Sequence, residues 1–124
     1  MKILNRKDFL ALQGQWLFSK YTPSIFDDLT IKIENYGERD FIVQQVVDAI
    51  ESNGTGDFID KLDDAEMNGA ELALDFYYAG RDGCFDDDQL FAVWSKDDVK
   101  ALIVRLQELV KEDYQNKPFA TFVV

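Results

Sequence analysis

The residues best suited to chemistry lie in one acidic stretch, GRDGCFDDDQLFAVW, at residues 80–94. Carboxylates are the ligands that hard cations such as Ca²⁺ and Mg²⁺ prefer, and a calcium loop of the EF-hand type needs oxygen ligands at its first, third and fifth positions and glycine at its sixth. With Gly80 as that glycine, the third and fifth positions are Tyr77 and Ala79, which offer no carboxylate. The stretch therefore favours a solvated turn of the kind that aspartate and glycine form, and we expect no bound metal.

The absence of histidine narrows the chemistry further. The chain has no histidine and one cysteine, Cys84. These counts exclude Ser-His-Asp and Cys-His catalysis and the usual zinc ligand sets. A lone cysteine cannot form an intrachain disulfide, which is typical of a reducing cytosol. We therefore expect a cytoplasmic protein that is not an enzyme and needs no cofactor.

One enzymatic alternative stays open, a small carboxylate- or metal-dependent enzyme that uses the acids at 82–88. Paired carboxylates hydrolyse glycosides when they flank a sugar cleft. The chain has 24 acidic residues, so many such pairs arise by chance. A length of 124 residues also leaves little room for a deep cleft, and the enzymatic reading is the weaker one.

Negative charge is concentrated in the middle of the chain. From Asp48 to Asp98 there are 15 acidic and three basic residues, whereas the remainder is almost neutral and the whole chain carries −11. Such a field repels nucleic acid and attracts basic proteins, so direct nucleic-acid binding is not expected. Two interpretations remain: a surface charged for solubility, or a docking surface for a basic partner.

The docking interpretation gives a specific functional hypothesis. Carboxylates spaced along a helix and an adjoining loop could imitate a phosphate backbone and occupy the groove of a nucleic-acid-binding enzyme. We therefore expect a small non-enzymatic inhibitor that binds a basic cytosolic protein; the alternative is an immunity protein against a basic nuclease toxin. The candidate partner-binding residues are Asp57, Asp60, Asp63, Asp64 and Glu66 on the helix, with Asp86, Asp87 and Asp88 if the fold brings them near it.

Three helices are predicted to position these residues. Apolar residues recur every three to four positions over 95–112, with Ser95 as N-cap and Asp98 in the capping-box position. A second amphipathic helix is predicted over 56–69 and a short one over 5–12. The apolar stripes of such helices ordinarily pack on a core.

The other apolar segments read as strands. In the second of them Leu29, Ile31 and Ile33 alternate with Thr30 and Lys32, a pattern that predicts the first three on the buried face. The strands are expected at 15–21, 29–35, 40–50, 71–78 and 89–94.

These elements predict a single α+β domain over residues 1–124. The order α-β-β-β-α-β-β-α favours a mainly antiparallel sheet of about five strands with two to three packed helices. Segment 40–50 fits either a strand or a helix, and the turn-like sequence before it favours a strand. Segment 118–124 could complete the sheet, hang free or pair with another chain, so both monomer and homodimer remain open. No stretch approaches the length of a membrane span.

Three stretches of the sequence, MKILNRKDFLAL, LFSKYTP and GRDGCFDDDQLFAVW, carry a family resemblance. The chain resembles small uncharacterised acidic proteins encoded by tailed phages and prophages. The resemblance implies an accessory protein that works in the host cytosol. Proteins of that class often inhibit a host defence or nucleic-acid enzyme by direct binding.

Overall fold

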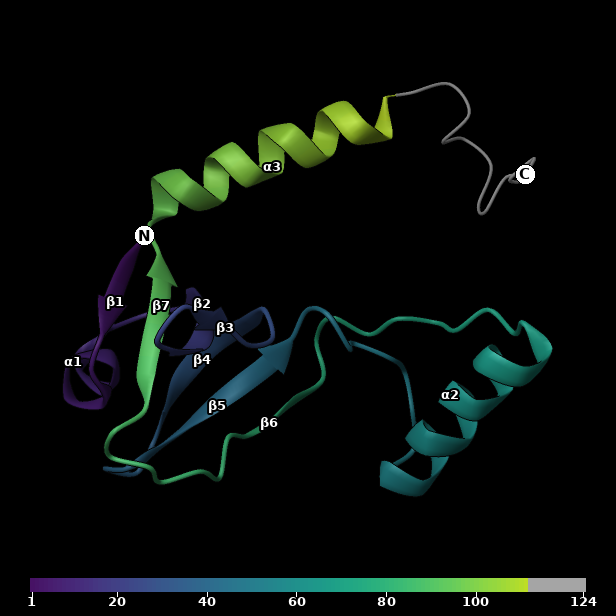
Figure 1. Cartoon of the computed structure of the whole chain (residues 1–124), viewed down its shortest axis with the longest axis horizontal. Helices are drawn as coiled ribbons and strands as arrows, with labels where there is room; N and C mark the ends of the chain where they lie inside the picture. Colours follow the sequence, from purple (N-terminus) through teal and green to yellow (C-terminus); the bar gives the residue numbers. More distant parts are fainter. Residues whose placement is uncertain (112–124) are drawn as a thin grey trace.

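The structure, a computed structural model, describes residues 1–111 and contains three helices and a seven-stranded antiparallel sheet (Figure 1). The predicted α+β class is therefore confirmed, with more strands than expected. The elements in chain order are β1 (Lys2–Leu4), α1 (Arg6–Ala11), β2 (Trp16–Thr22), β3 (Ile25–Phe26), β4 (Thr30–Tyr36), β5 (Asp40–Gln45), α2 (Thr55–Asn68), β6 (Ala79–Arg81), β7 (Leu90–Trp94) and α3 (Lys96–Val110).

The sheet runs in the order β1-β7-β2-β4-β5-β6, and β3 folds back onto β2. β7, which is apolar on both faces, lies between β1 and β2 as its sequence predicts. The ambiguous segment 40–50 contains β5, which pairs with β4 across a turn at Gly37. That glycine has a φ of 68°, a left-handed conformation that glycine adopts without steric cost. β1 and β3 were not predicted, because three and two residues are too few to show a period.

The core is an aromatic cluster between α1 and one face of the sheet. Phe9 of α1 is fully buried and stacks on Phe91 of β7 with ring centroids 4.0 Å apart. Phe18 and Phe41 approach the Phe9 ring at 4.8 and 5.1 Å, tilted and edge-on, geometries that aromatic pairs prefer. Asn5 caps α1 by accepting a hydrogen bond from the backbone of Asp8, as its sequence predicts.

The prediction of which β4 side chains point to the core is wrong. Thr30 and Lys32 are buried on the core side, whereas Ile31 and Ile33 are only half-buried on the other face. The Lys32 ammonium donates to the carbonyl oxygens of Phe9 and Leu12 at 3.1 and 3.0 Å. These carbonyls belong to the C-terminal end of α1, where cations are stabilised, so a lysine can occupy a core position here.

The strand predicted at 71–78 is also wrong. This segment makes only an isolated bridge, Leu74 to Ile50, and the true strand is β6, three residues long, at Ala79–Arg81. The alternation over 71–78 reflects a segment that runs alongside Ala49–Glu51. Its side chains Leu74, Phe76, Tyr77 and Tyr78 are exposed.

The two longer helices differ from expectation in how they pack. Within the described residues 1–111, neither α2 nor α3 has a buried residue. Figure 1 shows α3 leaving the end of β7 and running above the strands without lying on them, and α2 standing off beyond β6. The capping box at the start of α3, between Ser95 and Asp98, is present as predicted. The segment 118–124, considered as an extra strand or tail, lies outside the described residues.

Of the helices in residues 1–111, none is long and apolar enough to cross a membrane.

Candidate functional site

α2 carries five of the candidate carboxylates and is attached by a two-stranded stalk. Backbone hydrogen bonds run from Glu51 to Ala73 at 2.9 Å and from Asp75 to Ala49 at 2.8 Å, on either side of the bridge between Ile50 and Leu74. We call Ala49–Glu51 and Ala73–Asp75 the stalk. It fixes the root of α2 while leaving the helix itself clear of the sheet.

The first turn of α2 is held by Asp57. Its carboxylate accepts a hydrogen bond from the backbone of Asn53 at 2.8 Å and pairs with Lys61 at 3.5 Å. The backbone bond and then Lys61 hold the pKa of Asp57 below its usual range. Lys61 also donates to the Glu51 carbonyl at 2.7 Å. Asp57 is therefore ionised and largely occupied with local structure.

The far end of α2 is closed by Gly69, which has a left-handed φ of 70°. There Asp64 accepts a hydrogen bond from the Asn68 amide at 2.8 Å. Such a left-handed glycine satisfies the last helix carbonyls, and its backbone N–H indeed reaches Ala65. With both ends fixed, α2 presents its side chains on a defined surface.

The carboxylates of α2 gather on one face. Asp57, Asp60 and Asp64 are spaced three and four apart, so they lie on the same side of the helix over about 10 Å. Asp63 flanks this row, whereas Glu66 falls near the apolar stripe by the same periodicity. Apart from Asp57, which is half-buried, all of these carboxylates are exposed. We call Asp57, Asp60, Asp63 and Asp64 the acidic face.

The second group of candidates lies elsewhere. Asp86, Asp87 and Asp88 are exposed in the loop between β6 and β7, and Asp86 accepts from the Asp88 backbone at 2.9 Å. This is the aspartate turn that the sequence indicates. In Figure 1 the segment between β6 and β7 passes beneath the sheet on the side away from α2. The fold therefore does not bring the two acidic groups together.

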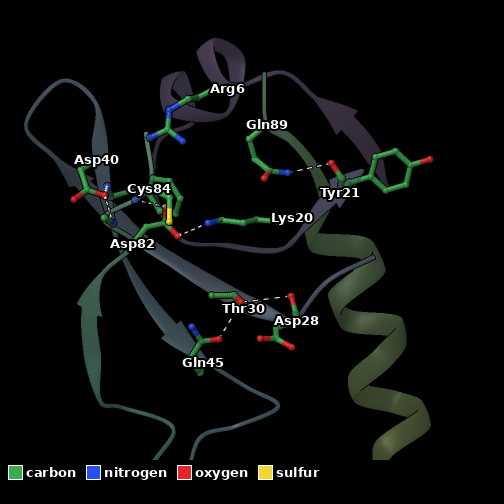
Figure 2. Close-up of polar contacts among 12 residues, drawn as sticks. Arg6, Lys20, Tyr21, Asp28, Thr30, Asp40, Gln45, Asp82, Cys84 and Gln89 are labelled. Carbon is green, nitrogen blue, oxygen red and sulfur yellow. Dashed lines mark hydrogen bonds and ion pairs between the residues drawn. The ribbon is translucent and has the colours of Figure 1, made fainter. Parts of the chain in front are cut away.

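A polar pocket that the sequence did not reveal opens beside the aromatic core (Figure 2). Its volume is about 160 Å³. Lys20 and Asp82 form an ion pair at 2.9 Å on one side, and the Thr30 hydroxyl donates to Gln45 at 3.3 Å on the other. The pocket is lined by Phe18, Lys20, Asp27, Asp28, Thr30, Val43, Gln45 and Asp82.

The pocket carries more negative than positive charge, because Asp27, Asp28 and Asp82 line it with Lys20. Partial loss of solvent raises the pKa of Asp28, and the neighbouring carboxylates of Asp27 and Asp48 raise it further. Loss of solvent is the larger cause, and the repulsion from the two other carboxylates adds to it, so the ionised form of Asp28 is disfavoured on both grounds. A guanidinium or ammonium group brought near Asp28 would relieve that repulsion.

Asp40 anchors the backbone that carries Asp82. It is buried and accepts hydrogen bonds from the backbone of Phe41 at 2.8 Å and of Gly83 at 3.0 Å, and from Arg81 at 2.9 Å. Burial raises the pKa of Asp40, but these three donors outweigh it and hold the pKa below its usual range. Asp40 thus fixes the start of the β6–β7 loop, and with it one wall of the pocket (Figure 2).

A metal centre has no support among residues 1–111, where no group of three or more Asp, Glu or Cys side chains is placed to hold an ion. Cys84 is exposed and donates its backbone N–H to Asp82 at 3.3 Å. Among the acids at 82–88, Asp82 therefore lines the pocket, whereas Asp86, Asp87 and Asp88 lie in the turn. They do not converge on one point.

One signal in the sequence could have revealed the pocket. Lys20 follows Trp16 and Phe18 at alternate positions of β2, so it must point to the same face as a core phenylalanine. A charged residue at such a position indicates a polar partner nearby. That partner, Asp82, is 62 positions away in the sequence, and only the sheet order brings the two together.

Comparison with known proteins finds no match, since no family model, no curated protein and no solved structure resembles the chain significantly. The functional argument therefore depends on the surface and pocket described above.

Proposed function

We propose that the protein is a small acidic, non-enzymatic binding protein. It occupies the basic, nucleic-acid-binding surface of a cytosolic enzyme and inhibits that enzyme. The observation that carries the proposal is the acidic face of α2, a row of mostly exposed carboxylates on a helix that ends at Gly69 and stands clear of the sheet. A phage-encoded inhibitor, the class that the sequence resembles, would act in this way.

The distribution of charge supports α2 as the contact element. Thr55–Asn68 contains five acidic residues and one lysine, whereas Lys96–Val110 contains three of each sign. Of the two helices that extend from the sheet, only α2 projects a negative field. Complementary fields accelerate association and select partners more than they add affinity, so binding should be fast and sensitive to salt.

The rigidity of α2 also supports the proposal. Its carboxylates are displayed from a helix whose backbone is held by hydrogen bonds near both ends and at the stalk, so little backbone order must be gained on binding. Preorganisation of this kind lowers the entropic cost of association. The polar pocket, which favours a cation, offers a second place for a basic side chain of the same partner.

The test is capture from bacterial lysate by the tagged full-length chain at low salt and at about 0.5 M salt, where screening is nearly complete beyond a few ångströms. Mass spectrometry identifies what is captured. We expect one basic nucleic-acid enzyme, released by salt and displaced by added duplex DNA or RNA. Capture of a nuclease toxin would assign the immunity role, while capture that added nucleic acid does not compete for would contradict mimicry.

Two matched variants locate the contact. The first carries Asp60→Lys, Asp63→Lys and Asp64→Lys on α2, and the second carries Asp86→Lys, Asp87→Lys and Asp88→Lys on the β6–β7 loop. Both change the net charge from −11 to −5. We expect the first to abolish capture and the second to retain it. Equal loss in both would show a non-specific charge effect, and unchanged affinity in the first would eliminate the acidic face.

A further inference from the structure

The polar pocket continues the face of the sheet that carries the aromatic core. Phe18 and Lys20 are alternate residues of β2, and Val43 and Gln45 are alternate residues of β5, so within each strand the two side chains point to the same face. Phe18, Thr30 and Val43 are 2%, 6% and 8% exposed and line the pocket. The pocket is therefore built on buried parts of the sheet and is not a gap between surface side chains.

The charges that line the pocket do not balance. Lys20 pairs with Asp82 at 2.9 Å, and the side chain of Asp82 is 10% exposed, so these two charges compensate each other. Asp27 and Asp28 line the same pocket, and none of the ion pairs formed within residues 1–111 includes either of them. Two carboxylates therefore lie at the pocket without a basic partner among the described residues.

Hydrogen-bond acceptors prevail at the end of the pocket where Asp28 lies beside Thr30 and Gln45 (Figure 2). The Thr30 hydroxyl donates to the Gln45 side-chain oxygen at 3.3 Å and approaches the Asp28 carbonyl oxygen at 3.5 Å. Once its single proton is used, a hydroxyl offers only lone pairs, and a carboxylate has only acceptor sites. A ligand at this end must therefore bring several donors as well as positive charge.

We propose that the pocket is a binding site for a guanidinium group. A guanidinium is planar, always charged and has five N–H donors, so it can bond to acceptors from separate segments of the chain at once. An ammonium is compact and more strongly hydrated, and therefore loses more on leaving water for a pocket backed by Phe18 and Val43. The pocket volume of about 160 Å³ is well above the roughly 30 Å³ that one water occupies, so the group can enter by displacing water.

A second hollow adjoins the pocket and reaches α2. It has a volume of about 170 Å³, shares Gln45 with the pocket, and is lined further on by Asp48, Ala49 and Phe58 of α2. Asp48 is also close enough to Asp28 to repel its carboxylate. A partner docked on the acidic face of α2 therefore meets acidic residues that continue to the pocket. The guanidinium is then that of an arginine on this partner, a step that rests on the proposed function.

The first test needs no partner. The full-length, isotope-labelled protein is titrated at low salt with N-acetyl-arginine methylamide and separately with its lysine analogue, and amide shifts are followed by NMR. We expect saturable shifts at Thr30, Val43 and the Gln45 side-chain amide, with the arginine compound binding at least about fivefold more tightly than the lysine compound. Equal affinities, or shifts that do not saturate at the pocket, would overturn the proposal.

Matched substitutions locate the binding. Asp28→Asn and Asp87→Asn each change the net charge from −11 to −10, but of the two residues it is Asp28 that lines the pocket. Asp28→Asn removes a charge-assisted hydrogen bond, and we expect the dissociation constant of the arginine compound to rise about tenfold. Asp87→Asn should change it by less than about twofold. Near-ultraviolet circular dichroism checks that both variants keep the folded sheet. Equal losses of affinity would show a general charge effect and overturn the assignment.

The source of the guanidinium is tested with the captured partner. If the arginine belongs to that partner, Asp28→Asn weakens partner binding as well, and the free arginine compound competes with the partner. Partner binding that Asp28→Asn leaves unchanged would overturn this source and indicate a free guanidino compound as the ligand.

The variant with Asp60→Lys, Asp63→Lys and Asp64→Lys separates this proposal from the proposed function. It should lose the partner and still bind the arginine compound at the pocket. An arginine compound that binds the wild type while no basic partner is captured would contradict the proposed function alone. Failure of the arginine compound to bind a protein that still captures its partner would contradict the pocket alone.

Discussion

The sheet with α1 differs from the two long helices in how far its side chains are buried. In the first region Phe9 and three other phenylalanine rings have centroids within 6.0 Å of one another, and even charged groups are enclosed. α2 and α3 together have no buried residue in the described part of the chain, and most of their large apolar side chains are exposed. The first region specifies the fold, whereas the second leaves apolar and charged side chains exposed to solvent.

Charged side chains also differ between the two regions in their burial. Arg6, Lys32 and Asp40 are all at most 5% exposed, and each has hydrogen-bond partners. Arg6 donates to the Arg39 carbonyl and lies over the Phe41 ring. Across residues 1–111, no buried side-chain nitrogen or oxygen lacks a partner. On the acidic face, in contrast, charge is left exposed to solvent.

The largest effect should come from the aromatic core. Phe9→Ala leaves a cavity among three phenylalanine rings and should reduce the free energy of unfolding by about 3–5 kcal/mol. The matched change on α2, Ile59→Ala, removes a side chain that is 51% exposed and should cost about 0.5 kcal/mol or less. Urea denaturation measures both. Comparable losses of unfolding free energy in the two variants would contradict the division between a packed core and two exposed helices.

Asp40→Asn should have the next largest effect. The substitution weakens three hydrogen bonds to a buried carboxylate and should reduce the free energy of unfolding by about 1–3 kcal/mol near pH 7. Because the pKa of Asp40 is lowered by folding, its contribution is present above the ordinary aspartate pKa and is lost as pH falls through the folded value. Urea denaturation between pH 7 and pH 3 should therefore show a weaker acid dependence in the variant. Asp87→Asn, in the exposed turn, is the control and should match the wild type.

A smaller effect should appear at alkaline pH. Burial lowers the pKa of Lys32, so between the folded value and the ordinary lysine value the unfolded chain binds more protons. Stability should therefore rise with pH across that window. Lys32→Met removes this slope, and the exposed control Lys100→Met keeps it. Identical pH profiles for the two variants would argue against a buried ammonium at the end of α1.

The smallest effect on folding should come from the acidic face. Asp60→Lys, Asp63→Lys and Asp64→Lys together should change the free energy of unfolding by less than about 1 kcal/mol, although the same variant should lose partner binding. Thermal denaturation beside the capture assay measures both properties. A large loss of stability would mean that the carboxylates serve the fold rather than a partner.

The sequence predicted the helices well because their end signals are local. Asn5, Ser95 and Gly69 act where their residue types indicate. The prediction of the buried face of β4 failed, because the alternation of Ile31 with Lys32 does not reveal which face meets α1. The deciding contacts, from Lys32 to the end of α1, span 20 and 23 positions.

Of the candidate site, the sequence predicted only the part whose residues are close together in the chain. The acidic face follows from the spacing of four aspartates on one helix, and the structure retains it. For the polar pocket the sequence offers only the signal of Lys20 in β2, because Asp28, Gln45 and Asp82 come from separate segments whose proximity depends on the sheet order. The same order separates Asp86, Asp87 and Asp88 from α2.

The stalk makes α2 an exchangeable module. β5 and β6 are antiparallel neighbours, and the stalk brings Ala49 and Asp75 together at the points where the chain leaves and returns. A short turn could join those two points without disturbing any strand pairing. Selection could therefore lengthen, recharge or replace the whole helix while the aromatic core continued to fold.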